Sequence, residues 1–178
     1  VLQHPPAVGD RVIVMGAGSL GLLTLEALQM MGYRANILVV GQYPFEVEIA
    51  RNQSEAEVVL ANNPGTAYEE VAAFVKGTVR YPEAGHITLE GGADLVYETT
   101  GLRDRIGDAL RFTGEGKKMV LMGINEPSGF DMTPLWFKSV KICGTLFSGR
   151  DSHKGEMRDT FDIAMDLAAG HGHPVSEI

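Results

Sequence analysis

Three glycines in the spacing G-x-G-x-x-G, Gly16, Gly18 and Gly21, directly follow the apolar run Val12–Met15. Gly16 permits a tight turn out of a buried strand, and Gly18 has no side chain, so a pyrophosphate can approach the backbone there. Gly21 lets the next helix pack close to the strand, and the first turn of that helix offers unpaired N–H groups and a positive dipole end. The pattern predicts a site for the phosphates of a dinucleotide.

The segments on either side of these glycines match that interpretation. An apolar face at helical spacing comes next, consisting of Leu20, Leu23, Ala27, Leu28 and Met31. Gly32 stands where a helix-ending glycine belongs, and Ile37–Val40 forms a second apolar run, which completes a strand–helix–strand unit. Because 22 of the 178 residues are glycine, the spacing alone is also compatible with a glycine turn in another α/β domain.

The remaining chain alternates between strand-like and helix-like segments. Further strands are expected at Glu57–Leu60, Asp94–Glu98, Lys118–Gly123 and Val140–Phe147, and further helices at Pro44–Asn52, Thr66–Lys76, Leu102–Phe112 and Glu156–Ala169. This alternation predicts an α/β fold with a doubly wound parallel sheet, a Rossmann fold, as a single domain over residues 1–178. Residues 77–92 are compatible with either a hairpin or a surface loop.

Three local expectations concern helix ends and helix faces. Thr66 with Glu69 three residues later is typical of a capping box, which would begin a helix at Thr66. Asp104, Arg105 and Asp108 are expected on an exposed helix face. The final helix should bury one apolar face made of Met157, Phe161, Ala164, Met165 and Ala168.

Composition and charge exclude several classes of partner. A formal net charge of −8 argues against nucleic acid or an anionic membrane as the main partner. No apolar run approaches the ~20 residues that span a bilayer. The single cysteine, Cys143, excludes an internal disulfide and predicts a buried inert thiol, so we expect a cytoplasmic location. The chain begins without methionine, which suggests a piece of a longer protein.

Four segments in order resemble the cofactor-binding domain of the medium-chain dehydrogenase/reductase family, which includes the zinc-type alcohol dehydrogenases. They are Val8–Asp10, Gly92–Glu98, Gly114–Gly123 and Gly144–Gly149. The resemblance covers essentially the whole chain and implies an NAD(P)-dependent oxidoreductase acting on an alcohol, aldehyde or ketone. It also implies that the catalytic domain, which supplies the proton chemistry and any zinc ligands, is absent from this chain, so no catalytic or metal-binding residue is expected here.

The resemblance implies a role for each matching position. The pyrophosphate would be lined by Gly16, Gly18, Ser19, Leu20 and Gly21. The adenosine and the middle of the cofactor would lie near Thr99, Thr100 and Gly101, and the nicotinamide near Gly123, Ile124, Thr145 and Phe147. Related enzymes pair through the last strands of this domain, so a homodimer through residues 136–147 is expected.

The choice of dinucleotide depends on the end of the second strand. NAD-preferring sites place a carboxylate there, about 20 residues past the glycines, to bind the ribose 2′-hydroxyl. This chain has Gly41, followed by Gln42 and Tyr43, which leaves room for a 2′-phosphate and favours NADP, with NAD possible. Glu46 falls in the next helix and is not counted in the site. Tyr43 could stack on adenine or be a plain loop tyrosine.

Two rival functions use the same glycine turn. One is a non-catalytic dinucleotide-binding module, such as a redox sensor or a regulatory subunit. The other is an S-adenosylmethionine methyltransferase, which usually has an acid at the end of the second strand, so Gly41 argues against it.

Overall fold

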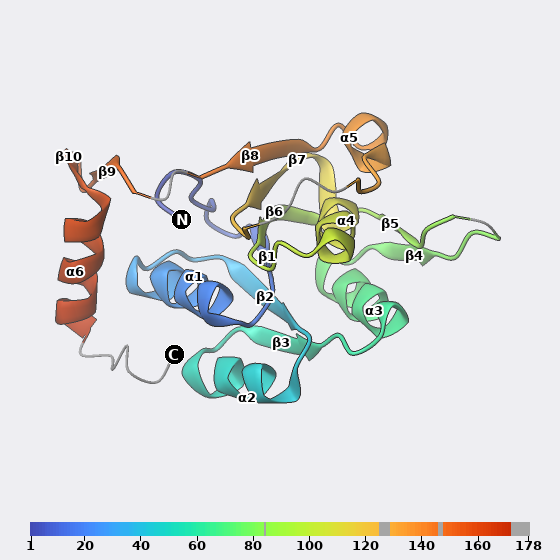
Figure 1. The fold of residues 1–178 in the computed structure, drawn as a ribbon, viewed down its shortest axis with the longest axis horizontal. Helices are drawn as coiled ribbons and strands as arrows, with labels where there is room; N and C mark the ends of the chain where they lie inside the picture. The colour runs from blue at the N-terminus through green and yellow to red at the C-terminus, as the bar shows by residue number, and fades with distance from the viewer. Residues whose placement is uncertain (84, 125–128, 146–147, 172–178) are drawn as a thin grey trace.

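The structure, a computed structural model, describes residues 1–83, 85–124, 129–145 and 148–171. Its centre is a six-stranded sheet in the order β3-β2-β1-β6-β7-β8, and every neighbouring pair is parallel (Figure 1). The strands are β1 (Arg11–Met15), β2 (Asn36–Gly41), β3 (Glu57–Leu60), β6 (Ala93–Glu98), β7 (Thr113–Leu121) and β8 (Lys141–Gly144). The predicted single-domain Rossmann fold is confirmed.

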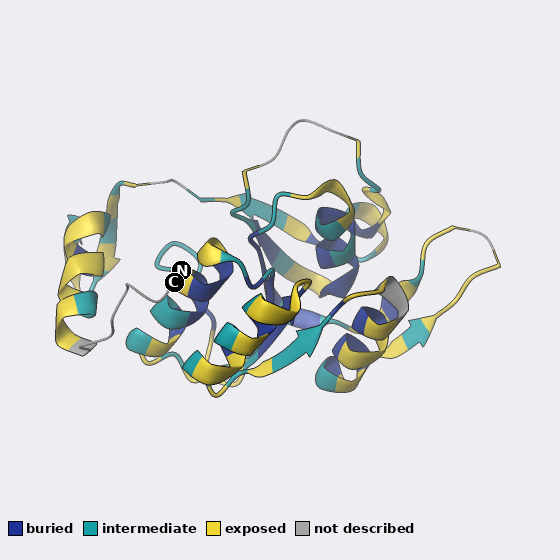
Figure 2. Ribbon diagram, turned by 60° about the horizontal axis from the view of Figure 1, so that its bottom comes forward, coloured by how far each residue is buried: buried dark blue, intermediate teal, exposed yellow. Residues whose placement is uncertain are grey.

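Helices cover both faces of the sheet, because alternate apolar side chains of β1 point to opposite faces and each set needs a core. Val12 and Val14 face a core shared with α1 (Ser19–Met30) and α2 (Pro44–Gln53). Ile13 and Met15 face the opposite core, shared with α3 (Pro64–Val75) and α4 (Arg103–Phe112). Figure 2 shows the buried strands between helices whose outer sides are exposed. A strand buried on both faces explains why residues 12–15 read as one continuous apolar run.

The strand order reverses at β1, which places the site. The chain goes from β1 outward to β2 and β3, and later returns to lay β6 against the other side of β1. In open α/β sheets, ligands bind outside the carboxyl ends of the strands at such a reversal. The residues that follow β1, β2 and β6 therefore meet at one edge.

Residues 77–92, which the sequence left open, contain a hairpin. Strands β4 (Thr78–Arg80) and β5 (Thr88–Glu90) pair antiparallel, and the Arg80 guanidinium lies 3.0 Å from the Glu90 carboxylate across the pair. The hairpin projects away from the main sheet (Figure 1).

The predicted capping box at Thr66 is wrong. Helix α3 begins two residues earlier, and its cap is Asn63, whose side-chain oxygen accepts hydrogen bonds from Thr66 N at 2.8 Å and Thr66 Oγ1 at 2.9 Å. Asn is at least as good a cap as Thr, and Pro64 suits the first helical position.

The last predicted helix also begins later than expected. Residues 150–153 and 156–159 form an antiparallel hairpin, β9 (Arg150–His153) and β10 (Glu156–Asp159), and α6 covers Thr160–His171. Lys154 and Gly155 both have positive φ, at 52° and 84°, and so close a two-residue hairpin turn. The hairpin holds α6 apart from the main sheet (Figure 1). The predicted buried face is therefore wrong, since Phe161 is 70% and Met165 59% exposed while Ile163 is buried.

The expected exposed face of α4 is only partly correct, because Asp104 is exposed whereas Arg105 and Asp108 are half-buried. The Asp108 carboxylate accepts a hydrogen bond from Tyr68 Oη at 2.9 Å and lies 3.7 Å from the Arg111 guanidinium, which also binds Asp131 at 2.7 Å. Burial raises the pKa of Asp108. Tyr68 comes from α3, which lies against α4 in the fold, and a periodicity within α4 alone could not show that this face is covered.

A half-buried lysine, Lys138, joins three parts of this layer. Lys138 follows the short helix α5 (Thr133–Phe137), and its Nζ donates to the carbonyl oxygens of Gly91 at 2.8 Å, Arg111 at 2.9 Å and Leu89 at 3.3 Å. Burial lowers the pKa of Lys138 to about 8. The lysine thus holds the ends of β5 and α4 against α5.

We expect Lys138→Met to lower the free energy of unfolding by about 1–3 kcal/mol, because three carbonyl groups lose their donor. The unfolded chain keeps this lysine protonated to about pH 10. The unfolded state therefore binds more protons above pH 8, and the lysine's contribution to the stability of the native protein rises with pH. Urea unfolding at pH 7.5 and 9.5 should show the gap between the two proteins widening. Parallel pH profiles would contradict the lowered pKa.

No helix in the described ranges is long and apolar enough to cross a membrane.

Candidate functional site

The glycine turn after β1 has the geometry that its sequence predicts. Gly16 has φ of 107°, and its N–H donates to Val40 O at 2.9 Å. A Cβ on Gly16 would lie 2.7 Å from Thr99 Oγ1, and one on Gly21 would lie 2.1 Å from the Gly16 carbonyl oxygen. Both positions therefore require glycine, one for the turn and one for the close approach of α1 to β1.

Gly18 differs from Gly16 and Gly21, the other two glycines of the motif. Its φ of −71° and ψ of −177° are open to any residue, and the nearest atom to a Cβ there would be Glu46 Oε1 at 3.4 Å. The fold itself tolerates a side chain at this position. Without a side chain, the backbone of Gly18 is open to the cavity that it lines.

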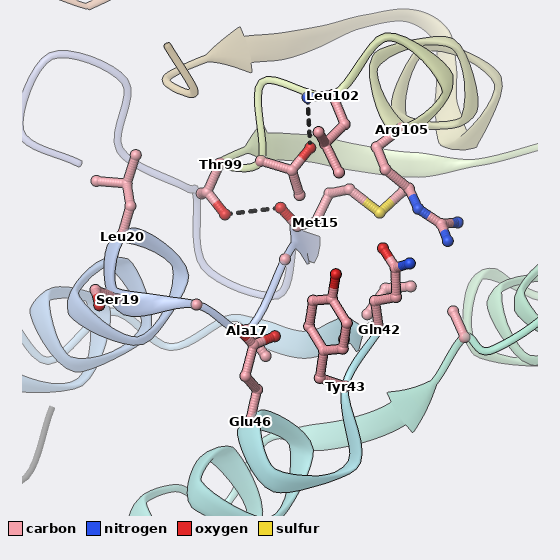
Figure 3. Close-up of a pocket in the computed structure, with 16 residues that line it drawn as sticks. Met15, Ala17, Ser19, Leu20, Gln42, Tyr43, Glu46, Thr99, Leu102 and Arg105 are labelled. Atoms are coloured by element: carbon pink, nitrogen blue, oxygen red, sulfur yellow. Dashed lines mark hydrogen bonds between the residues drawn. The ribbon is translucent and has the colours of Figure 1, made fainter. Parts of the chain in front are cut away.

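A cavity opens at this edge of the sheet, beside the turn (Figure 3). The predicted site residues that line it are Gly16, Gly18, Ser19, Leu20, Gly41, Gln42, Tyr43, Thr99 and Thr100. They come from the ends of β1, β2 and β6, which are separated in sequence and neighbours in the sheet.

The N-terminus of α1 opens into the same cavity. Gly18 caps the helix without any side-chain hydrogen bond, and the first turn holds no acidic residue. The first backbone bond of the helix runs from Leu22 N to Gly18 O at 2.9 Å, so the N–H groups ahead of Leu22 have no partner inside the helix. Unpaired donors and the positive end of the dipole favour an anionic group here.

The loop after β6 is fixed by Glu98, which is fully buried. Its carboxylate accepts hydrogen bonds from Thr100 N at 2.9 Å, from Thr100 Oγ1 and from Gly101 N at 3.1 Å. Its backbone carbonyl accepts from Met122 N at 2.8 Å and Gly123 N at 3.0 Å. Burial raises the pKa of Glu98, and the bonds from Thr100 and Gly101 oppose that rise. One residue therefore positions the loops after both β6 and β7.

We expect Glu98→Ala to lower the free energy of unfolding by about 2–4 kcal/mol, because three donors lose their acceptor in a buried loop. The cavity wall at Thr99 and Thr100 should loosen with it, and affinity for a bound dinucleotide should fall about tenfold. Urea unfolding and a ligand titration measure the two effects. Glu98→Gln, which keeps one acceptor oxygen, should have a stability and an affinity between those of the wild type and Glu98→Ala. Wild-type stability and affinity of Glu98→Ala would contradict this role of Glu98.

Only some of the residues expected near the nicotinamide lie close to one another in the structure. Backbones of Gly101 and Gly123 pack directly, since a Cβ on Gly123 would lie 2.1 Å from Gly101 N. Ile124 is 96% exposed beside them. Thr145 follows β8 at the sheet edge and does not line the cavity, and Phe147 lies outside the described residues.

The described cavity lining also includes seven residues that the sequence did not point to: Met15, Ala17, Val40, Glu46, Ala61, Leu102 and Arg105. Three of them, Glu46, Leu102 and Arg105, lie where a helix begins after a strand. Glu46 was assigned to the helix after β2 and not counted, although a helix that starts at residue 44 turns its third residue back toward the sheet edge. Leu102 is the N-cap of α4 and Arg105 lies in its first turn, directly after the loop formed by Thr99–Gly101. Both residues therefore also lie at the edge of the sheet. Attention to the first turn of each helix after a strand would have found all three.

Comparison with known proteins agrees with this geometry. A family model described as "Zinc-binding dehydrogenase" matches residues 19–169 of the chain. The chain belongs to this family. The medium-chain dehydrogenase resemblance of the sequence is thereby confirmed.

Individual members of the family are longer than this chain. Glucose 1-dehydrogenase of Thermoproteus tenax is 31% identical over 128 residues, which are 72% of this chain and 29% of that protein. The crystal structure of 2R,3R-butanediol dehydrogenase from Bacillus subtilis superposes with a TM-score of 0.69 at 23% identity, over 93% of this chain and 41% of the other. A protein from Sinorhizobium meliloti 1021 described as a zinc-binding dehydrogenase, solved bound to NADP, has a TM-score of 0.63 at 18% identity, over 92% and 43%. These similarities show a shared fold over one part of each dehydrogenase.

Because the family is described as zinc-binding, the described residues are compared with the ligand set that a zinc ion requires. Among residues 1–83, 85–124, 129–145 and 148–171, no group of three His, Cys, Asp or Glu side chains lies close enough to hold a metal ion. The thiol of Cys143, predicted to be buried, is free and only half-buried on the edge strand β8. The described residues therefore do not fit a zinc ion.

Proposed function

We propose that this chain holds the dinucleotide of an NAD(P)-dependent oxidoreductase and presents its nicotinamide for hydride transfer to or from an alcohol, aldehyde or ketone. The observation that carries the proposal is the cavity at the strand-order reversal, where the bare Gly18 backbone meets an N-terminus of α1 that no side chain caps. Membership of the zinc-binding dehydrogenase family supports it.

Each part of the cavity would have one task. Backbone N–H groups around Gly18, Ser19 and Leu20 would bind the pyrophosphate, and the adenosine would lie between Tyr43 and the loop held by Glu98. Gly101 and Gly123 would support the nicotinamide half. These groups bind and orient, and none of them is proposed to transfer a proton.

The proton chemistry would belong to a second domain. The chain spans 29% of the curated relative and about two fifths of the solved ones, which supports the interpretation of residues 1–178 as a cofactor-binding domain. A catalytic domain outside it would supply the substrate pocket and any zinc ligands, in a cytoplasmic enzyme. The open edge of β8, with exposed Trp136 and Phe137 nearby, supports a homodimer through the last strands.

The dinucleotide could be NADP or NAD, and different observations favour each. Gly41 puts no carboxylate at the end of β2, and the Sinorhizobium relative was solved with NADP. The room beside Gly41 that the sequence suggested is filled, since a Cβ there would lie 2.6 Å from Val47 Cγ2 and 3.0 Å from Ala17 Cβ. Among the described residues that line the cavity, however, Arg105 is the only arginine or lysine, and it stands on α4 rather than beside Gly41. A 2′-phosphate without a cation beside it is held weakly.

Calorimetric titration of the chain with NADH, NADPH and S-adenosylmethionine in parallel tests the proposal. We expect saturable binding of at least one dinucleotide and none of the adenosyl compound. Binding of S-adenosylmethionine alone would favour the methyltransferase. A full-length protein that binds NADH but oxidises no alcohol would favour the non-catalytic sensor.

A further inference from the structure

We propose that Glu46 binds the adenosine ribose of the dinucleotide and makes this chain prefer NAD(H) to NADP(H). The inference rests on the proposed function, because it names the form of the cofactor that the same cavity takes. It also assigns a specificity-determining role to a residue outside the usual position at the end of the second strand.

The position of Glu46 follows from how α2 begins. Pro44 starts the helix immediately after the loop that ends β2, and Glu46 lies in its first turn. The carboxylate points back across the cavity toward the glycine turn, as Figure 3 shows beside Ala17. Glu46 Oε1 lies 3.4 Å from the point where a Gly18 side chain would begin.

That position is where a ribose would lie. With the pyrophosphate on the backbone at Gly18, the adenosine ribose is attached to the phosphate through a single methylene group. The ribose therefore lies just beyond Gly18, and the wall it meets there is formed by Glu46 and Tyr43.

The Glu46 carboxylate is half-buried and without a protein partner. Within the described ranges, no donor hydrogen-bonds to it and no cation pairs with it. Burial raises the pKa of Glu46, as expected for a charge without compensation. A carboxylate in this setting gains from donors that a ligand supplies.

A ribose with a free 2′-hydroxyl supplies such donors. The 2′- and 3′-hydroxyls form a vicinal diol, and a carboxylate can accept both O–H groups at once. In NADP the 2′-hydroxyl is replaced by a dianionic phosphate, which has no donor at neutral pH and repels the carboxylate. The same residue therefore attracts one cofactor and rejects the other.

The one basic side chain among the described cavity residues does not reverse this preference. Arg105 lies on the Gln42 side of Tyr43, whereas Glu46 lies on the side of the glycine turn (Figure 3). The Arg105 guanidinium is already 3.5 Å from the Asp108 carboxylate, which balances its charge.

The test is calorimetric titration of the wild-type chain, Glu46→Gln and Glu46→Lys with NADH and with NADPH. We expect the wild type to bind NADH about tenfold or more tightly than NADPH, because the carboxylate accepts hydrogen bonds from the free 2′-hydroxyl and repels the 2′-phosphate. Glu46→Gln should narrow this ratio about tenfold, and Glu46→Lys should reverse it. Glu48→Gln is the matched control, because Glu48 is exposed on the same helix, does not line the cavity and changes the net charge equally.

The outcomes separate this inference from the proposed function. If both dinucleotides bind and the ratio is the same in wild type and Glu46→Gln, the role of Glu46 is refuted while dinucleotide binding stands. A wild type that prefers NADPH refutes it equally. If neither dinucleotide binds to the folded chain, the proposed function fails and the inference fails with it.

Discussion

Gly18→Ala is expected to weaken dinucleotide binding about 100-fold while leaving the fold intact. The backbone angles at residue 18 suit any amino acid, and the added methyl group would meet nothing closer than Glu46 Oε1 at 3.4 Å. On the cavity side, the methyl group would stand where the pyrophosphate must touch the backbone. Loss of two charge-assisted hydrogen bonds of about 1.5 kcal/mol each accounts for a factor of that size.

Two measurements on the Gly18→Ala chain separate binding from folding. Thermal unfolding should give a midpoint within about 2 °C of wild type, and calorimetry should give the weakened binding. Gly170→Ala is the matched control, because Gly170 has open space around its Cα, is exposed on α6 and lies outside the cavity. Wild-type affinity of Gly18→Ala would show that no ligand approaches the backbone there.

Gly21→Ala is expected to have the opposite effect and to destabilise the fold itself. Its Cβ would lie 2.1 Å from the Gly16 carbonyl oxygen and 2.9 Å from the Gly16 carbonyl carbon. Both are backbone atoms of the turn that β1 and α1 share, so no side chain can rotate away. Relief requires α1 to move off the sheet, which costs about 3 kcal/mol or more.

The Gly21→Ala effect should appear as a fall in the midpoint of thermal unfolding of about 6–12 °C for a domain of this size. Circular dichroism measures it without any ligand, so the result does not depend on the cofactor. Gly170→Ala again serves as control and should be neutral or slightly stabilising, because alanine is the better helix former. An unchanged midpoint for Gly21→Ala would mean that α1 does not pack on β1 as closely as described.

The elements that depend on short-range pattern could be predicted from the sequence. The run Val12–Met15, the glycine turn and α1 are neighbours in sequence and in space, so their residues alone specify the contact. The parallel sheet follows from the alternation of strands and helices. The ends of β1, β2 and β6 then meet by topology, which is why the residues predicted after each of them line one cavity.

Features that depend on contacts between distant segments could not be predicted in the same way. Asp108 was expected in solvent, and its burial depends on Tyr68 from another helix. Glu46 was placed outside the site because the ribose-binding carboxylate was expected at the end of β2, and not in the helix that follows. The start of α2 at Pro44 was predicted correctly, but the direction in which its first turn faces depends on how α2 packs against the sheet.

The central claim, that a dinucleotide binds at the glycine turn, is tested most directly by amide chemical shifts of the isotopically labelled chain during titration with NADH. We predict shifts at residues 16–21, 41–43 and 99–101, which belong to three segments that meet only in the folded sheet. Absence of shifts at saturating NADH would contradict the claim. So would shifts confined to another hollow, which is lined by α4 residues such as Arg111, by the loop between β4 and β5 at His86 and Ile87, and by Tyr68 and Phe130.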